Sequence, residues 1–174
     1  LENNILSTIR ILEYARISGT RMVIYSSSSS VVGNGAGPTS PYGASKLIPE
    51  ILCKNYSDVY GLDTVCYRHF NVYSEDQPVD GPYATAIPNF MHCIREGKRP
   101  HITGDGEQRR DMLHVLDAVS ANTFCMNYEK AFGGRKFDTA TGKNISLNEI
   151  REIVRQYHPD VVFDRVPERK GDVR

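Results

Sequence analysis

The chain has 174 residues, enough for a packed core, and its 40% hydrophobic and 24% charged residues are typical of a globular protein. Its 21 basic and 21 acidic residues cancel, so the net charge gives no indication of binding to nucleic acid or to a membrane surface. No apolar run approaches the ~20 residues of a membrane span and no signal peptide opens the chain, so we expect a cytoplasmic protein.

Helices and short apolar runs alternate through the N-terminal part of the chain. Ile5, Ile9 and Leu12 recur at helical spacing, and Gly19 suits a helix C-terminus. Ser40 can cap a helix whose first position is Pro41. The pattern predicts a helix over 3–18, a buried strand over 22–25, a helix from 41 to about 60 and a second buried strand from 64 to 67.

The rest of the chain continues this alternation. Ser146 and Glu149 have the spacing of a capping box, which opens a helix. The pattern predicts helices over 87–96, 116–128 and 146–157, and strands over 136–139 and 161–163. Alternating helices and buried strands indicate an α/β fold with a parallel sheet, in which we expect 22–26 and 64–70 to be parallel neighbours.

The cysteines give no sign of a metal site. None of Cys53, Cys66, Cys93 and Cys125 belongs to a C-x-x-C pair, and their gaps do not fit a zinc site. We therefore expect reduced thiols that pack as small apolar residues, and no bound metal.

A tyrosine and a lysine four residues apart are the strongest chemical signal. Tyr42 and Lys46 share one face of the predicted helix, and a lysine cation near a phenol favours the phenolate. Such a pair can act as a base on a sugar or alcohol hydroxyl. The spacing alone is short enough to arise by chance, and an exposed helix pair is the alternative interpretation.

The context of this pair favours a site. Five serines, residues 26–30, follow the first apolar strand, and ligands of open α/β sheets bind at the carboxyl ends of strands. A serine hydroxyl there could hydrogen-bond the same substrate oxygen as Tyr42. Taken singly, each serine could equally be a loop residue that satisfies local backbone.

The chain resembles the NAD-dependent epimerases and dehydratases of nucleotide sugars, whose best-known member is UDP-glucose 4-epimerase and which are extended short-chain dehydrogenases/reductases. Five blocks carry the resemblance, in the family's order: S-S-S-S-S-V-V-G over 26–33, S-P-Y-G-A-S-K over 40–46, R-H-F-N-V-Y over 68–73, G-D-G-E-Q-R-R-D over 104–111 and R-K-G-D-V-R over 169–174. The resemblance implies a partial Rossmann-like parallel sheet with helices on both faces, formed by residues 1–75. It implies a smaller nucleotide-sugar-binding region over 76–174, partly interleaved with the first.

The resemblance also implies roles at the cofactor end of the site. Tyr42 would be the base at the sugar hydroxyl, Lys46 would bind the nicotinamide ribose, and Ser28 would hydrogen-bond the sugar oxygen. Phe70 would contact the nicotinamide. Tyr42 would remove the hydroxyl proton while a hydride passes to NAD, and an epimerase would return the hydride to the other face of the resulting keto sugar.

At the nucleotide end the resemblance implies four further residues. Asn71 would contact the substrate diphosphate, Arg110 and Arg169 would bind phosphate, and Asp172 would bind ribose. Without the G-D-G-E-Q-R-R-D block around it, Arg110 would be interpreted as a solvated surface charge.

Several departures from the family pattern bear on activity. The printed sequence holds no G-x-x-G-x-x-G motif, so it offers no glycine-rich cradle for the NAD pyrophosphate. The pattern matches the middle and C-terminal part of the family, and we expect a homodimer or a requirement for the missing N-terminal part. Pro49 is expected to kink the helix of Tyr42, and His69, in place of the family's tyrosine, is interpreted as a buried neutral histidine.

One local feature separates the family's reactions. The sugar 4,6-dehydratases carry Asp-Glu where this chain has Ser29 and Ser30, and the UDP-glucuronate decarboxylases usually carry a Glu there; serine cannot easily do that acid–base work. We therefore expect a nucleotide-sugar 4-epimerase. The alternatives are an inactive nucleotide-sugar-binding or oligomerisation fragment, and a dehydratase or decarboxylase of the same family.

Overall fold

The computed structural model describes residues 2–33, 35–79 and 85–168. The chain divides into two compact units, each of which contains two separate stretches of sequence. The first unit comprises residues 1–70 and 116–139, and the second comprises 71–115 and 140–174.

The first unit is built on a three-stranded parallel sheet. Its strands are β1 (Met22–Ser28), β2 (Asp63–His69) and β7 (Arg135–Thr139), with β2 in the middle. Met22 lies opposite Asp63 and Ser28 opposite His69, so the expected parallel pairing of the first two strands is confirmed. The α/β fold class predicted from the alternating pattern is also confirmed.

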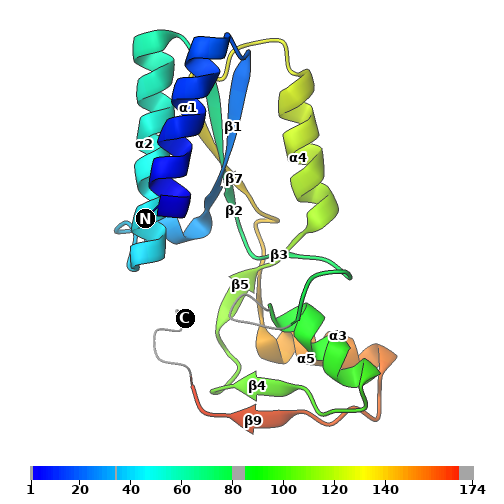
Figure 1. The fold of residues 1–174 in the computed structure, drawn as a ribbon. Helices are drawn as coiled ribbons and strands as arrows, with labels where there is room; N and C mark the ends of the chain where they lie inside the picture. The colour runs from blue at the N-terminus through cyan, green and yellow to red at the C-terminus, as the bar shows by residue number, and fades with distance from the viewer. Residues whose placement is uncertain (1, 34, 80–84, 169–174) are drawn as a thin grey trace. The chain divides into compact units, whose positions relative to one another are not determined.

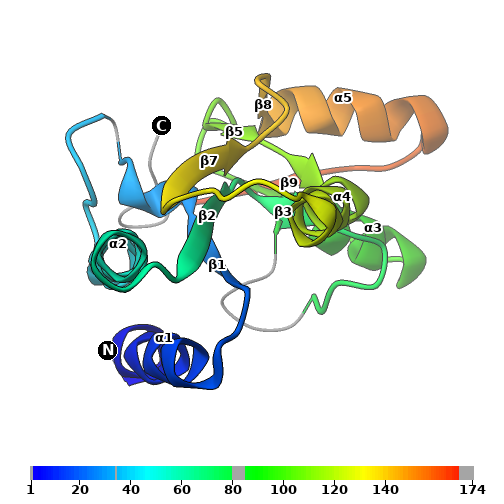
Figure 2. The ribbon, with the colours of Figure 1, turned by 90° about the horizontal axis from the view of Figure 1, so that it is seen from above.

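Helices cover both faces of this sheet. On one face are α1 (Ser7–Ser18), preceded by a π-helical turn η1 (Glu2–Leu6), and α2 (Pro41–Tyr60); α4 (Val115–Asn127) covers the other (Figures 1 and 2). The core under α1 and α2 contains Leu12, Cys53 and Cys66, and that under α4 contains Val65 and Cys125. The buried thiols pack as apolar side chains and are free, as expected.

Local sequence signals define the ends of these helices. Gly19 follows α1 with φ at +70°, a conformation that a side chain would strain. The Ser40 hydroxyl accepts a hydrogen bond from the Gly43 N–H at 3.1 Å and caps α2, with Pro41 in the first turn. Pro49 does not end α2, which runs without a break to Tyr60.

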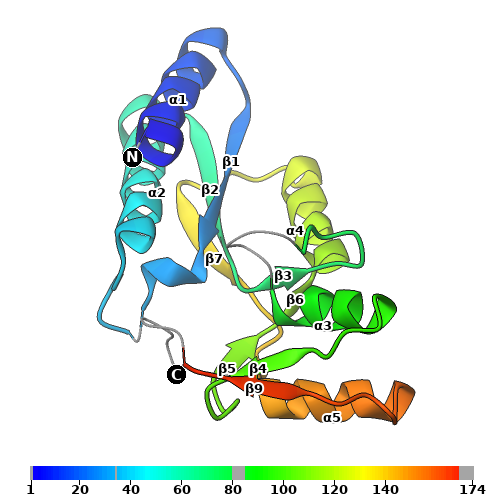
Figure 3. The same cartoon turned by 60° about the horizontal axis from the view of Figure 1, so that its bottom comes forward.

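The second unit contains short strand pairs and two helices. Its helices are α3 (Ala86–Arg95) and α5 (Leu147–Tyr157) (Figure 3). The strands are β3 (Val72–Tyr73) paired with β6 (Leu113–His114), β4 (His101–Thr103) with β9 (Asp164–Val166), and β5 (Arg109–Asp111) with β8 (Asn144–Ser146); only the last pair is antiparallel. Phe90, Ile102, Ile150 and Val154 form its core. The capping box is confirmed, because the Ser146 and Glu149 side chains bond each other's backbone N–H.

The expected last strand over 161–163 is wrong. The strand begins at Asp164 and pairs in parallel with β4. Val161 and Phe163 pack against the core of the second unit instead, with the Phe163 ring edge-on to Phe90 at 5.1 Å. The apolar run marked burial in the core, and the backbone pairing follows it in the polar segment Asp164–Val166.

Removing a core side chain of α1 should destabilise the first unit. Leu12 is 0% exposed, so Leu12→Ala should lower the free energy of unfolding by about 2–5 kcal/mol, since the cavity is only partly filled by relaxation. Ile17, on the same helix, is 70% exposed, and Ile17→Ala should change the free energy of unfolding by less than about 0.5 kcal/mol. Urea unfolding followed by circular dichroism compares the two, and equal effects would contradict the described core.

Candidate functional site

The carboxyl end of β1 turns through the serine cluster. Ser28 ends the strand with extended backbone (φ −149°, ψ 149°) and caps the 3₁₀ turn η2 (Ser29–Val31). Its hydroxyl oxygen accepts a hydrogen bond from the Ser30 N–H at 3.2 Å and its O–H donates to the Ser30 hydroxyl at 3.2 Å. Ser28 therefore has a fixed place at the strand end where ligands of parallel sheets bind.

The first turn of α2 lies against this serine turn. A Cβ on Gly43 would come within 2.4 Å of the Ser30 carbonyl oxygen and 2.9 Å of the Pro38 Cβ. Only glycine allows this approach without movement of the backbone. The closeness of the two segments fixes where Tyr42, the neighbour of Gly43, enters the helix.

Lys46 reaches back from α2 to β1. Its ammonium donates to the Ser26 carbonyl oxygen at 2.8 Å and lies 5.2 Å from the centre of the Tyr25 ring. Burial lowers the pKa of Lys46. Lys46 thus lies against the last residues of this strand, whereas the proximity of the Ser28 hydroxyl to Tyr42 stays a prediction.

Two tyrosines lie near this lysine in different surroundings. Tyr42 is 47% exposed, in the first turn of α2. Tyr25 is a β1 residue whose hydroxyl is buried with no hydrogen-bond partner among the described residues. Burial is the main cause that raises the pKa of Tyr25, so this phenol stays protonated. Of the two, only Tyr42 is open to a substrate.

A buried carboxylate lies one turn beyond Lys46 on α2. Glu50 accepts hydrogen bonds from the Ser27 hydroxyl at 2.6 Å and from Arg68 through Nε at 2.9 Å and Nη2 at 2.8 Å. Lys136 lies 3.9 Å from it. Burial opposes the charge of Glu50, but the bonds from Arg68 and Ser27 outweigh burial and lower its pKa. The sequence alone did not single out Glu50; its four-residue spacing from Lys46 indicates only that the two share a helix face.

The end of β2 is joined to β7 beside this cluster. The His69 Nδ1 and Thr139 Oγ1 lie 2.8 Å apart, and the Phe70 N–H donates to the Thr139 carbonyl oxygen at 3.2 Å. Burial, and then the positive charge of Lys46, lower the pKa of His69, which agrees with a neutral histidine.

The candidate nucleotide residues belong to the second unit. The Asn71 amide donates to the Asp111 carbonyl oxygen at 2.8 Å, and the Arg110 guanidinium donates to the Arg109 carbonyl oxygen at 2.8 Å. Asn71 and Arg110 thus lie near one segment, whereas Arg169 and Asp172 lie outside the described residues.

Asp111 is a structural anchor of the second unit that sequence reasoning missed. Its carboxylate accepts hydrogen bonds from the Thr141 N–H and hydroxyl, both at 2.8 Å, and from the Gly142 N–H at 2.7 Å. The Asn71 amide also bonds the Asp111 carbonyl oxygen. These contacts connect β5 to both of the sequence stretches that form the second unit, 71–115 and 140–174.

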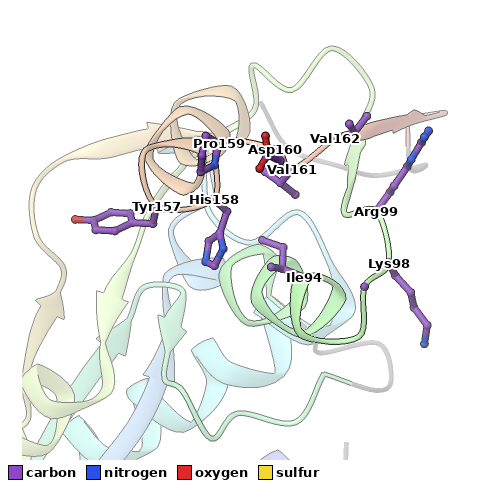
Figure 4. Close-up of a pocket in the computed structure, with 10 residues that line it drawn as sticks. Ile94, Lys98, Arg99, Tyr157, His158, Pro159, Asp160, Val161 and Val162 are labelled. Atoms are coloured by element: carbon purple, nitrogen blue, oxygen red, sulfur yellow. The ribbon is translucent and has the colours of Figure 1, made fainter.

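A surface cavity in the second unit does not suit an anion. It has a volume of about 440 Å³ and lies between the ends of α3 and α5 (Figure 4). Lys98 and Arg99 line it, but their side chains extend away from the hollow between Ile94, His158 and Val161. Within the described ranges no cluster of acidic, histidine or cysteine side chains could hold a metal ion, and none of the helices there is long and apolar enough to cross a bilayer.

The sheet, its covering helices and the lysine at the strand end define a Rossmann-like α/β protein. Residues 1–140 match the NAD dependent epimerase/dehydratase family. The chain belongs to this family, which confirms what the five sequence blocks indicated.

The relatives of the chain act on nucleotide sugars. It is 32% identical to a UDP-glucose 4-epimerase from Mycolicibacterium smegmatis, over 87% of this chain and 51% of the relative. It is 30% identical to a UDP-N-acetyl-alpha-D-glucosaminuronate decarboxylase from Bacillus cytotoxicus, over 99% of this chain and 61% of the relative.

A solved structure has the same fold as this chain. The UDP-N-acetylglucosamine 4-epimerase from Methanobrevibacter ruminantium, in complex with UDP-N-acetylmuramic acid, superposes with a TM-score of 0.91 at 32% identity, over 99% of this chain and 58% of that one. The chain therefore spans between half and two thirds of the length of these proteins.

Acid should weaken the first unit through Glu50. Because its pKa lies below the ordinary value of 4.5, its contribution to stability is complete above that pH and is lost as pH falls through the lower, folded-state value. Glu50→Gln should cost about 3–5 kcal/mol at pH 7, since Arg68 loses its buried partner, and should flatten the fall in stability below pH 4.5.

Asp58→Asn is the matched control, because Asp58 forms an exposed ion pair with Lys54 on the same helix. It should cost less than about 1 kcal/mol at pH 7. Urea unfolding from pH 7 to pH 3 measures both variants. Equal losses in the two variants would contradict the buried ion pair.

Proposed function

We propose that this chain supplies the sugar-binding and proton-transfer part of an NAD-dependent nucleotide-sugar 4-epimerase. The observation that carries the proposal is the anchoring of α2 at the carboxyl end of β1, where Lys46 bonds Ser26 and Tyr42 is open to solvent. An ammonium, an accessible phenol and a serine hydroxyl are the groups that we propose for removal of a proton from a sugar hydroxyl.

The residues of the first unit fit the nicotinamide end of NAD. Lys46 is fixed at the ligand-binding end of a parallel sheet, and its ammonium suits the hydroxyls of a ribose. Lys46 would hold the nicotinamide ribose, and Phe70, which follows β2, would contact the ring. NAD, when bound, supplies the acceptor and then the donor of a hydride.

Tyr42 and Ser28 would handle the proton. Tyr42 would remove the proton from the C4 hydroxyl as the C4 hydrogen leaves with its electron pair, and a 4-keto sugar would result. The Ser28 hydroxyl, which donates to Ser30 in the structure, would turn to donate a hydrogen bond to the sugar oxygen in both states. After the keto sugar has turned, the hydrogen returns to its other face and Tyr42 gives the proton back to the oxygen.

The second unit would hold the nucleotide. Asn71 would contact the diphosphate, Arg110 and Arg169 would bind phosphate oxygens, and Asp172 would bind the ribose. UDP is the proposed nucleotide because the compared relatives are named for UDP-sugars. A cytoplasmic location, and either a homodimer or a requirement for the N-terminal part of the family that this chain does not match, complete the proposal.

The alternatives differ at specific residues. A decarboxylase is among the relatives, but Ser29 and Ser30 open the turn η2 with hydroxyls, which are poor acids and bases for elimination. An inactive nucleotide-sugar-binding module would use only the second unit's residues. Isothermal titration with NAD and with UDP separately distinguishes this module from an enzyme: binding of UDP alone favours the module, and binding of both favours the enzyme.

The 174-residue chain by itself should not epimerise UDP-glucose or UDP-N-acetylglucosamine at a measurable rate. Its candidate cofactor residues all lie at the nicotinamide end, and each 1.4 kcal/mol of lost contact weakens NAD binding tenfold. Incubation with NAD at stoichiometric enzyme, followed by proton NMR, is the measurement. Clear conversion would show that the chain binds NAD without the glycine-rich cradle and would contradict this prediction.

Fusion to the N-terminal part of the M. smegmatis relative that this chain does not match should restore turnover. In this fused protein Tyr42→Phe should reduce kcat by about 10²–10⁴, the contribution of a positioned acid–base group, and leave UDP binding nearly intact. A coupled assay and titration with UDP measure the two effects. A Tyr42→Phe variant as active as the parent would contradict the role of Tyr42.

A further inference from the structure

A row of polar and charged side chains crosses the sheet of the first unit beneath α2. Ser27 of β1 lies opposite Arg68 of β2, and Arg68 lies opposite Asp138 of β7. Glu50 descends from α2 onto this row, 0% exposed, and bonds both Ser27 and Arg68. One carboxylate thus ties the helix to two adjacent strands.

Glu50 and Lys46 hold the same short stretch of β1. They lie one turn apart on α2, and residues at this spacing share a helix face. Lys46 bonds the Ser26 carbonyl oxygen, and Glu50 accepts from the hydroxyl of the next residue, Ser27. A rotation of α2, or a slide along its axis, would therefore break both contacts together.

The helix has a weak point between its two anchors. Pro49 lies inside α2, lacks the N–H that would bond the Ser45 carbonyl, and is fully buried. The turn that carries Tyr42 and Lys46 is therefore joined to the rest of the helix by one backbone hydrogen bond fewer. A strong contact directly after Pro49 compensates for that loss and keeps the first turns in register with β1.

We propose that Glu50, paired with Arg68, is a positioning residue that sets α2 so that Lys46 meets the Ser26 carbonyl oxygen and Tyr42 stands at the end of β1. This inference rests on the proposed function for its consequence in turnover. The placement of Lys46 itself is a property of this chain and can be measured without any reaction.

The ammonium group of Lys46 reports this placement directly. Its hydrogen bond to Ser26 should slow the exchange of its Nζ protons with water, so that its ¹⁵N–¹H signal persists where those of exposed lysines vanish. Lys46→Arg assigns the signal. Glu50→Gln should speed this exchange about tenfold, the ratio that corresponds to 1.4 kcal/mol, whereas Asp58→Asn on the same helix should leave it unchanged.

The amide spectrum of each variant shows whether it is folded. If Glu50→Gln does not fold, Arg68→Lys replaces it, because lysine keeps the charge but loses the two-pronged contact with Glu50. Lys46 exchange that stays slow in a folded variant of either kind would overturn the proposal. Rapid exchange of the Lys46 Nζ protons in Glu50→Gln, together with slower exchange in Glu50→Asp, would support the proposal.

Turnover supplies an independent second readout. In the fused protein, Glu50→Gln should lower kcat about tenfold and leave KM for the nucleotide sugar nearly unchanged, because the residues proposed to bind the nucleotide belong to the other unit. Equal changes in kcat and KM would indicate a merely structural role and overturn the proposal. If Tyr42→Phe leaves turnover intact, the proposed function fails, while the exchange of Lys46 still decides the role of Glu50.

Discussion

The contact between the start of α2 and the carboxyl end of β1 is the constraint on which the candidate site depends. Gly43 allows the helix to approach the Ser30 carbonyl oxygen, and Lys46 crosses from the helix to the Ser26 carbonyl oxygen at 2.8 Å. Both contacts lie where the chain passes from β1 through the turn η2 into α2, so the helix begins near the end of the strand that precedes it. The helix then returns the chain to β2, which is parallel to β1.

Burial divides the titratable groups at this end of the sheet into those that can react and those that hold the fold. Burial keeps Tyr25 protonated, and His69 has a lowered pKa, so neither adds a charge near Lys46. Glu50 keeps its charge because Arg68 and Ser27 bond it. The half-exposed Tyr42 is left as the group that a sugar hydroxyl can approach. Family membership and this arrangement support the same interpretation.

The sequence predicted elements well where the signal is local and less well where it depends on distant partners. Ser40 and Ser146 cap helices as expected, since each side chain bonds a backbone N–H three residues away. The expected strand at 161–163 was wrong because an apolar run reports burial, while pairing with β4 depends on a distant segment. Tyr42, Lys46 and the serines could be found from their spacing and order. Glu50 and Asp111 could not be assigned roles, because their partners, such as Arg68 and Thr141, lie far along the chain.

The central claim is that the chain's Tyr42 and Lys46 serve a transient oxidation at C4 of a nucleotide sugar. UDP-glucose deuterated at C4 tests this most directly with the fused protein and NAD. The 4-epimer formed should keep its deuterium at C4, because the hydrogen leaves and returns as a hydride that does not exchange with water. NMR and mass spectrometry of the product measure its retention. Replacement of the deuterium by solvent hydrogen would contradict the oxidation mechanism and, with it, the role assigned to Tyr42.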